Sequence, residues 1–281
     1  MVLNEGATSG SSPPQLLSRD RLTLSVAAVL ISVSVASWGV VFYEMPMMAM
    51  ASGGMMGVAA LVSSVSPSAI GLFELIWVVG MAAMMFPAMI PIVTFYNRFS
   101  TKVEANPRLA RAVGTPLFLA GYLAVYAGLG LAVYLGVFLA VGVSSAVPSL
   151  AGVASVAPGV VLIFAGAYQL SPRKSTFLMQ CVSPIGFFTL HSHRGLTGSF
   201  TMGLSHGEYC VGCCWAYMVV MFAVALMSLP FMVVLSVVIA LEKMVLRGAA
   251  WLTRAIAAGL IVLGLASLVF PGFLSILSAG L

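Results

Sequence analysis

Residues 205–218, SHGEYCVGCCWAYM, hold three of the four cysteines of the chain and one of its three histidines. Thiolate and neutral imidazole are ligands for copper(I) and zinc. At about 100° per residue, a helix would place four of these side chains on one face and Glu208 on the opposite one. The four are Cys210, Cys213, Cys214 and His206. Buried cysteine also serves as a small hydrophobe, but this grouping favours a metal site.

A second set of soft ligands lies in FELIWVVGMAAMMFPAMIP, residues 73–91. Met81 and Met85 follow at helical spacing on the face that carries Glu74. Methionine often only fills cores, whereas an ionisable residue inside an apolar segment is a functional candidate. We therefore expect Glu74, Met81 and Met85 to form a relay toward the cysteine face, provided that the two helices are neighbours.

Two further groups flank these segments. YEMPMMAM, residues 43–50, clusters thioethers, which select copper(I) over harder ions. We expect this segment to be an outer loop that collects metal, or alternatively an apolar stretch dipping into the membrane. Its candidate ligands are Met45, Met47, Met48 and Met50. MQCVSPIGFFTLHSH, residues 179–193, offers Cys181, His191 and His193, which are either inner ligands or a solvated loop.

The composition identifies the setting of these ligands. Apolar residues make up 61% of the 281 residues and charged residues only 7%, against about 25% charged in a soluble domain. The chain is therefore expected to be an all-α, polytopic membrane helix bundle. We expect residues 1–18 to form a disordered cytoplasmic tail and residues 19–281 a single transmembrane domain.

Seven segments are long and apolar enough to cross a bilayer, at about 20 residues each. They are residues 22–43, 70–97, 112–141, 152–170, 199–227, 229–247 and 253–277. With seven spans, all twelve lysines and arginines fall on one side. The positive-inside rule then places the N-terminus in the cytoplasm and the C-terminus outside, in the cell (inner or plasma) membrane. The basic charge thus reports topology and not nucleic-acid binding. Glu242 and Lys243 are expected to anchor a helix end at the inner interface.

Three blocks of the chain resemble a bacterial family of predicted metal-binding integral membrane proteins, over about residues 70–248. The first block has Trp77, Met81, Met84, Met85 and Pro87. The third has Gly207, Cys210, Cys213, Cys214 and Trp215. The resemblance implies a multi-span helical protein that binds a metal. In the middle block, many members have a second cysteine four positions before Cys181, where this chain has Phe177.

These observations favour a membrane protein that handles, transfers or supplies copper(I), with zinc as the alternative metal. We expect such a protein to carry the metal rather than to catalyse a reaction. Its partners would be other membrane, periplasmic or extracellular metal-handling proteins. Two other classes stay open. One is a thiol–quinone oxidoreductase that uses Cys210 and Cys213 as a redox pair. The other is a non-catalytic subunit of a membrane copper enzyme. The oligomeric state is not predicted.

Overall fold

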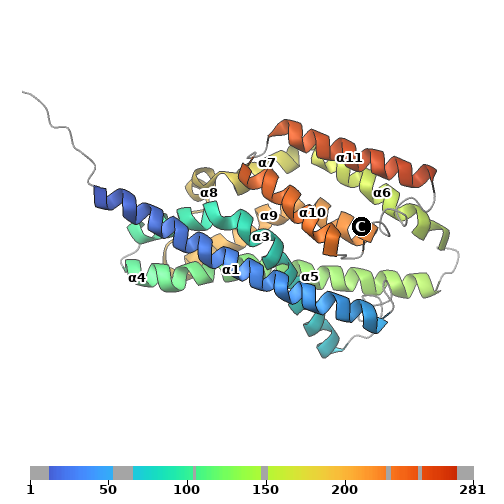
Figure 1. Ribbon diagram of the computed structural model, residues 1–281, viewed down its shortest axis with the longest axis horizontal. Helices are drawn as coiled ribbons and strands as arrows, with labels where there is room; N and C mark the ends of the chain where they lie inside the picture. The colour runs from blue at the N-terminus through green and yellow to red at the C-terminus, as the bar shows by residue number, and fades with distance from the viewer. Residues whose placement is uncertain are drawn as a thin grey trace, which may run out of the picture.

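The computed structural model describes residues 13–52, 66–103, 106–146, 151–225, 229–245 and 249–270, and this part of the chain is helical with no strand (Figure 1). The long helices are α1 (Pro13–Ser52), α3 (Pro67–Val103), α5 (Thr115–Ala146), α6 (Ala151–Gln169), α9 (Gly195–Ala225), α10 (Leu229–Ala240) and α11 (Ala250–Val269). The short ones are α4 (Pro107–Leu109), η1 (Ala110–Gly114), α7 (Pro172–Val182), α8 (Pro184–Leu190) and η3 (Leu241–Val245). The all-helical class is confirmed for these residues.

Four of the described helices are long and apolar enough to cross a membrane. They are Thr23–Tyr43, Pro67–Thr101, Pro107–Ala140 and Ala250–Val269, and the shorter apolar helix Val156–Gln169 accompanies them. The helix α9 has the length to cross but carries polar groups such as His206 and Glu208 along it. The chain is therefore a helical membrane protein, while its seven crossings and the orientation of its ends stay predictions.

The first helix differs from the expected one at both ends. Its backbone begins at Pro13, within the segment expected to be disordered, and continues to Ser52. The four methionines expected in an outer loop therefore lie in this helix. Their side chains, those of Met45, Met47, Met48 and Met50, lie outside the described residues, so the expected collection site stays a prediction.

The helix α9 is packed on several sides, against α5, α6 and α7 (Figure 1). Its contact with α5 depends on glycine. A Cβ atom at Gly203 would lie 2.0 Å from the carbonyl oxygen of Phe118, and one at Gly121 would lie 2.2 Å from that of Phe200. Small residues let two backbones approach this closely in membrane bundles. This approach brings tyrosines of α5 up to the cysteines of α9.

Candidate metal centre

The cysteine-bearing face of α9 is turned inward. Cys210, Cys213 and Cys214 are each 1% exposed and His206 is 2% exposed. Glu208, on the opposite side of the helix, is exposed. The helical spacing in the sequence therefore predicted correctly which side chains share a face, and the structure adds that this face is the buried one.

The fourth cysteine comes from α7. This helix begins with Pro172 at its first turn, and the Ser171 side chain caps it by accepting a hydrogen bond from the Lys174 backbone N–H at 3.2 Å. Lys174 and Leu178 on α7 are buried, and Cys181 follows three residues after Leu178, near that buried face. The Cys181 Sγ lies 3.6 Å from the Cys213 Sγ, so α7 delivers a thiol to α9.

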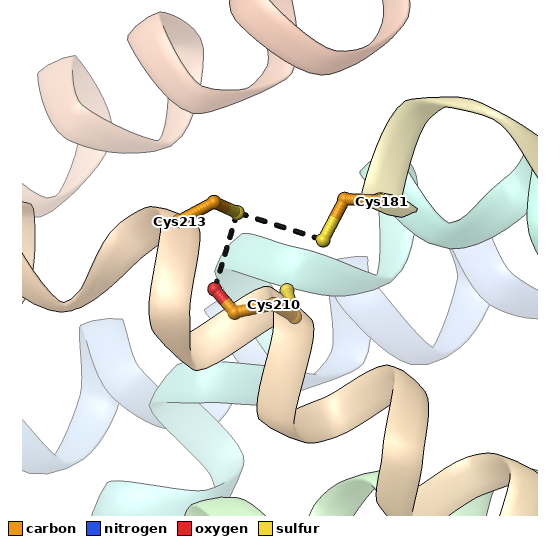
Figure 2. A group of neighbouring side chains, drawn as sticks. All are labelled: Cys181, Cys210 and Cys213. Carbon is orange, nitrogen blue, oxygen red and sulfur yellow. Dashed lines mark hydrogen bonds between the residues drawn. The ribbon is translucent and has the colours of Figure 1, made fainter. Parts of the chain in front are cut away.

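Three sulfurs thereby converge, those of Cys181, Cys210 and Cys213, all within 4.8 Å of one another. We call these residues the cysteine trio. Figure 2 shows Cys181 and Cys213 pointing toward one another from α7 and α9, with Cys210 one turn away. The Cys214 Sγ is 3.4 Å from the Cys213 Sγ but does not belong to this mutual group.

The cysteine trio fits a thiophilic ion. With metal–sulfur bonds of about 2.3 Å, sulfurs bound to one ion lie roughly 4 Å apart in a planar three-ligand site. The separation of 3.6 Å between Cys181 and Cys213, with all three sulfurs within 4.8 Å of one another, is compatible with this value. Burial raises the pKa of the Cys181 thiol well above its ordinary range. An ion that binds there must therefore displace a proton, as thiol ligation generally requires.

Cys210 is surrounded by hydrogen-bonding groups. The Lys243 Nζ donates to its Sγ at 2.8 Å. The Tyr126 hydroxyl donates at 3.2 Å, and the Tyr122 hydroxyl lies at the same distance. An ammonium group and phenols stabilise a thiolate by charge and hydrogen bonding. Cys210 is therefore the member of the trio that the protein itself is best arranged to hold as an anion.

The expectation that Glu242 and Lys243 anchor a helix at the interface is wrong. Glu242 is 1% exposed and Lys243 is 7% exposed. Glu242 forms a salt bridge with the buried Lys174 of α7, and it accepts hydrogen bonds from Tyr217 at 3.1 Å and Thr253 at 2.9 Å. Buried charges persist when they are paired and hydrogen-bonded. The partners lie 68 and 33 residues away along the chain, so spacing alone could not reveal them.

His206 lies apart from the trio, in an aromatic cage. Its ring centroid is 6.1 Å from that of Phe118, 6.0 Å from Tyr122 and 5.1 Å from Phe187. Its Nδ1 is buried without a hydrogen-bond partner. His206 therefore shares the inward face of α9 with Cys210, one turn away, but its ring is not grouped with the three sulfurs.

The predicted relay on α3 is buried but is not joined directly to the trio. Met81 and Met85 are fully buried. Both carboxylate oxygens of Glu74 are buried without a hydrogen-bond partner, and they pack on Gly130 of α5, where a Cβ would lie 2.7 and 2.8 Å from them. The helix α3 packs mainly against α1, α5 and α10. Both α3 and α9 therefore pack against α5, but α3 and α9 are not each other's main packing partners.

Tyr126 of α5 makes one hydrogen bond with each of these regions, through its backbone and through its side chain. The Trp77 indole N–H on α3 donates to the Tyr126 carbonyl oxygen at 2.8 Å, and the Tyr126 hydroxyl donates to Cys210. Tyrosines on α5 were not singled out by the sequence reasoning. Their i, i+4 spacing on an apolar helix, at 122 and 126, is the only signal that could have pointed to them.

The histidines of the inner loop are not brought to the sulfurs. The His191 Nε2 lies 3.3 Å from the Tyr209 hydroxyl, and its ring stacks on Phe187. His193 is exposed. Of the three inner candidates, only Cys181 joins the cysteine trio.

Comparison with known proteins identifies the family of the chain. A family model described as a copper chaperone, PpoB2, matches residues 74–267. No match was found among curated proteins or among solved structures. The matched region includes the cysteine trio, Lys243 and Glu242, and it spans more than half of the sequence. The chain therefore belongs to the PpoB2 copper chaperone family.

Proposed function

We propose that the protein binds copper(I) as a cargo ion within the membrane and exchanges it with another metal-handling protein. The observation that carries this proposal is the convergence of three thiol sulfurs within 4.8 Å, from two separate helices, with Cys210 and Cys213 buried and Cys181 half-buried. Thiolates favour copper(I) and zinc over hard ions, and membership in a copper chaperone family supports copper(I) among these.

The number of ligands also favours copper(I) over zinc. Structural zinc sites are almost always four-coordinate and tetrahedral. The trio supplies three sulfurs, and no fourth Cys, His, Asp or Glu ligand atom of the described residues lies within 4.8 Å of all three. Cys214 is the sulfur beside it, at 3.4 Å from the Cys213 Sγ. We assign Cys214 to an exchange position, from which it could take the place of one trio ligand as the ion leaves.

The path to the trio is part of the proposal. We place seven crossings in the cell membrane, with a cytoplasmic N-terminus and an external C-terminus. The methionines at residues 45–50 would collect the ion. Glu74, Met81 and Met85 would bind the ion in turn along α3. His206 would be an additional ligand near Cys210. The burial of Met81 and Met85 and the unpartnered carboxylate of Glu74 support this path.

Metal analysis of the purified protein tests the proposal. We expect about one copper(I) per chain after anaerobic loading, and a large loss in the Cys181→Ser, Cys210→Ser and Cys213→Ser variants. Cys214→Ser should keep most of the copper at equilibrium but slow its release, because Cys214 is equally buried, lies outside the trio and is assigned to exchange. X-ray absorption should show sulfur ligands around copper. Equal copper content in wild type and all three trio variants would refute the site.

A thiol–disulfide function is the second candidate. The Cys213 Sγ lies 3.6 Å from the Cys181 Sγ and 3.4 Å from the Cys214 Sγ. Because Cys213 and Cys214 are adjacent in the chain, the pair that could form a disulfide between two helices is Cys181–Cys213. Mass spectrometry of peptides after mild oxidation distinguishes the candidates. A rapid, reversible Cys181–Cys213 bond in a protein that binds no copper would favour redox chemistry.

A further inference from the structure

We propose that Lys243 is a specificity-determining residue, whose fixed positive charge makes the cysteine trio favour a monovalent ion over a divalent one. The inference rests on the proposed function, because it concerns the choice of ion at that same site. It assigns a role to a residue that is not itself a metal ligand and that the sequence reasoning placed at the membrane interface.

No carboxylate of the described residues forms a salt bridge with Lys243. The one salt bridge among the described residues joins Lys174 to Glu242, and this pair is neutral as a unit. Tyr122 and Tyr126 are neutral hydrogen-bonding groups on Cys210. The partner of Lys243 is the Cys210 sulfur itself, 2.8 Å from its Nζ. The positive charge of the ammonium group therefore acts on the trio and on any ion bound there.

The local backbone explains how two consecutive charged residues serve separate partners. Glu242 and Lys243 lie in η3, a π-helical turn at the end of α10. Single π-helical turns inside or at the end of α-helices are frequent at functional sites. Here the turn directs Glu242 to Lys174 of α7 and Lys243 to Cys210 of α9. The ion pair thus fixes η3 against α7, and Lys243 is held at the trio.

The charge of the ion decides how strongly Lys243 opposes it. An ion bound to Cys210 at about 2.3 Å would lie within roughly 5 Å of the ammonium nitrogen. Repulsion between the two is proportional to the charge of the ion, so a divalent ion is opposed twice as strongly as a monovalent one. The number of thiol protons displaced is the same for both ions, so that cost cancels in the ratio of their affinities.

The test is the ratio of zinc(II) to copper(I) affinity of the full-length protein in detergent, measured by competition with chromophoric chelators. Lys243→Gln removes the charge but keeps a hydrogen-bond donor for Cys210, and Lys243→Met removes both. We expect each variant to raise the zinc-to-copper ratio by roughly 10- to 100-fold. Lys243→Arg, which keeps the charge, should stay close to wild type.

Arg194→Met is the matched control for net charge, because Arg194 is exposed and should leave the ratio unchanged. An unchanged ratio in Lys243→Gln, with both ions still bound, would overturn this inference and leave the proposed function intact. A fall in both affinities at constant ratio would also overturn it, because it would show a purely structural role. A wild-type protein that binds neither ion would overturn the proposed function, and this inference with it.

Discussion

The two regions that carry soft ligands differ in how their polar atoms are satisfied. Around the cysteine trio, Cys210 and Glu242 are both met by several donors from other helices. On α3, the Glu74 carboxylate is buried without a hydrogen-bond partner, beside a face of buried methionines. A satisfied polar network fixes side chains in one arrangement, whereas an unsatisfied group is costly to keep. We therefore expect the trio to be the firm binding site and the α3 face to hold an ion more weakly.

The largest expected effect contrasts one ligand from each region. Cys213→Ser should lower copper(I) affinity by more than about 100-fold, since losing a ligand exceeds the 10- to 100-fold cost of losing an outer-shell partner. Met85→Leu conserves volume and should change equilibrium affinity by less than about threefold, because the α3 face is assigned to passage and not to storage. Competition with a copper(I) chelator measures both. A comparable loss in Met85→Leu would place the methionine in the main site.

The next effect concerns the ion pair that holds the trio together. Lys174→Met leaves Glu242 buried without its cation, and breaking one partner of such a pair costs about 3–5 kcal/mol. Denaturation in detergent should show this loss of stability, and copper affinity should fall because α7 no longer holds Cys181 against Cys213. The double variant Lys174→Met with Glu242→Leu should regain much of the stability. A single variant as stable as wild type would show that the pair does not hold α7 in place.

The region around the cysteine trio, whose polar atoms have partners, is also the harder one to predict from the sequence. The buried face of α9 and its cysteines followed from helical spacing, because residues three and four apart share a side of any helix. The roles of Cys181, Lys243 and Glu242 depend on contacts between helices distant in the chain, which periodicity does not encode. Charge placement does not reveal that Lys174 and Lys243, which the positive-inside count places on the cytoplasmic side, are buried between helices. A lysine beside a glutamate in an otherwise apolar segment was the signal available.

A smaller effect sharpens the assignment of α3. Glu74→Gln removes a carboxylate that lacks partners, so we expect unchanged or slightly higher stability, by up to about 1 kcal/mol. The copper(I) affinity of the trio should stay the same. The rate at which copper(I) binds to the protein reconstituted in proteoliposomes should fall if Glu74 lies on the path. Glu208→Gln is the matched control, because Glu208 is exposed on α9. Unchanged loading in Glu74→Gln would remove Glu74 from the proposed path.

The smallest effect is expected from placing a cysteine at position 177, where many members of the resembled family have one. Phe177 lies one turn before Cys181 on α7, and its ring packs on Gly212, where an added Cβ would lie 2.7 Å from the ring. Phe177→Cys would bring a fourth thiol next to α9. A fourth sulfur suits the tetrahedral preference of zinc more than copper(I), so zinc affinity should rise several-fold while copper(I) affinity changes little. Phe177→Ser makes the same cavity without a thiol and should gain no zinc. Equal zinc binding in the two variants would mean that position 177 does not reach the ion, and that the site of this chain is complete with three sulfurs.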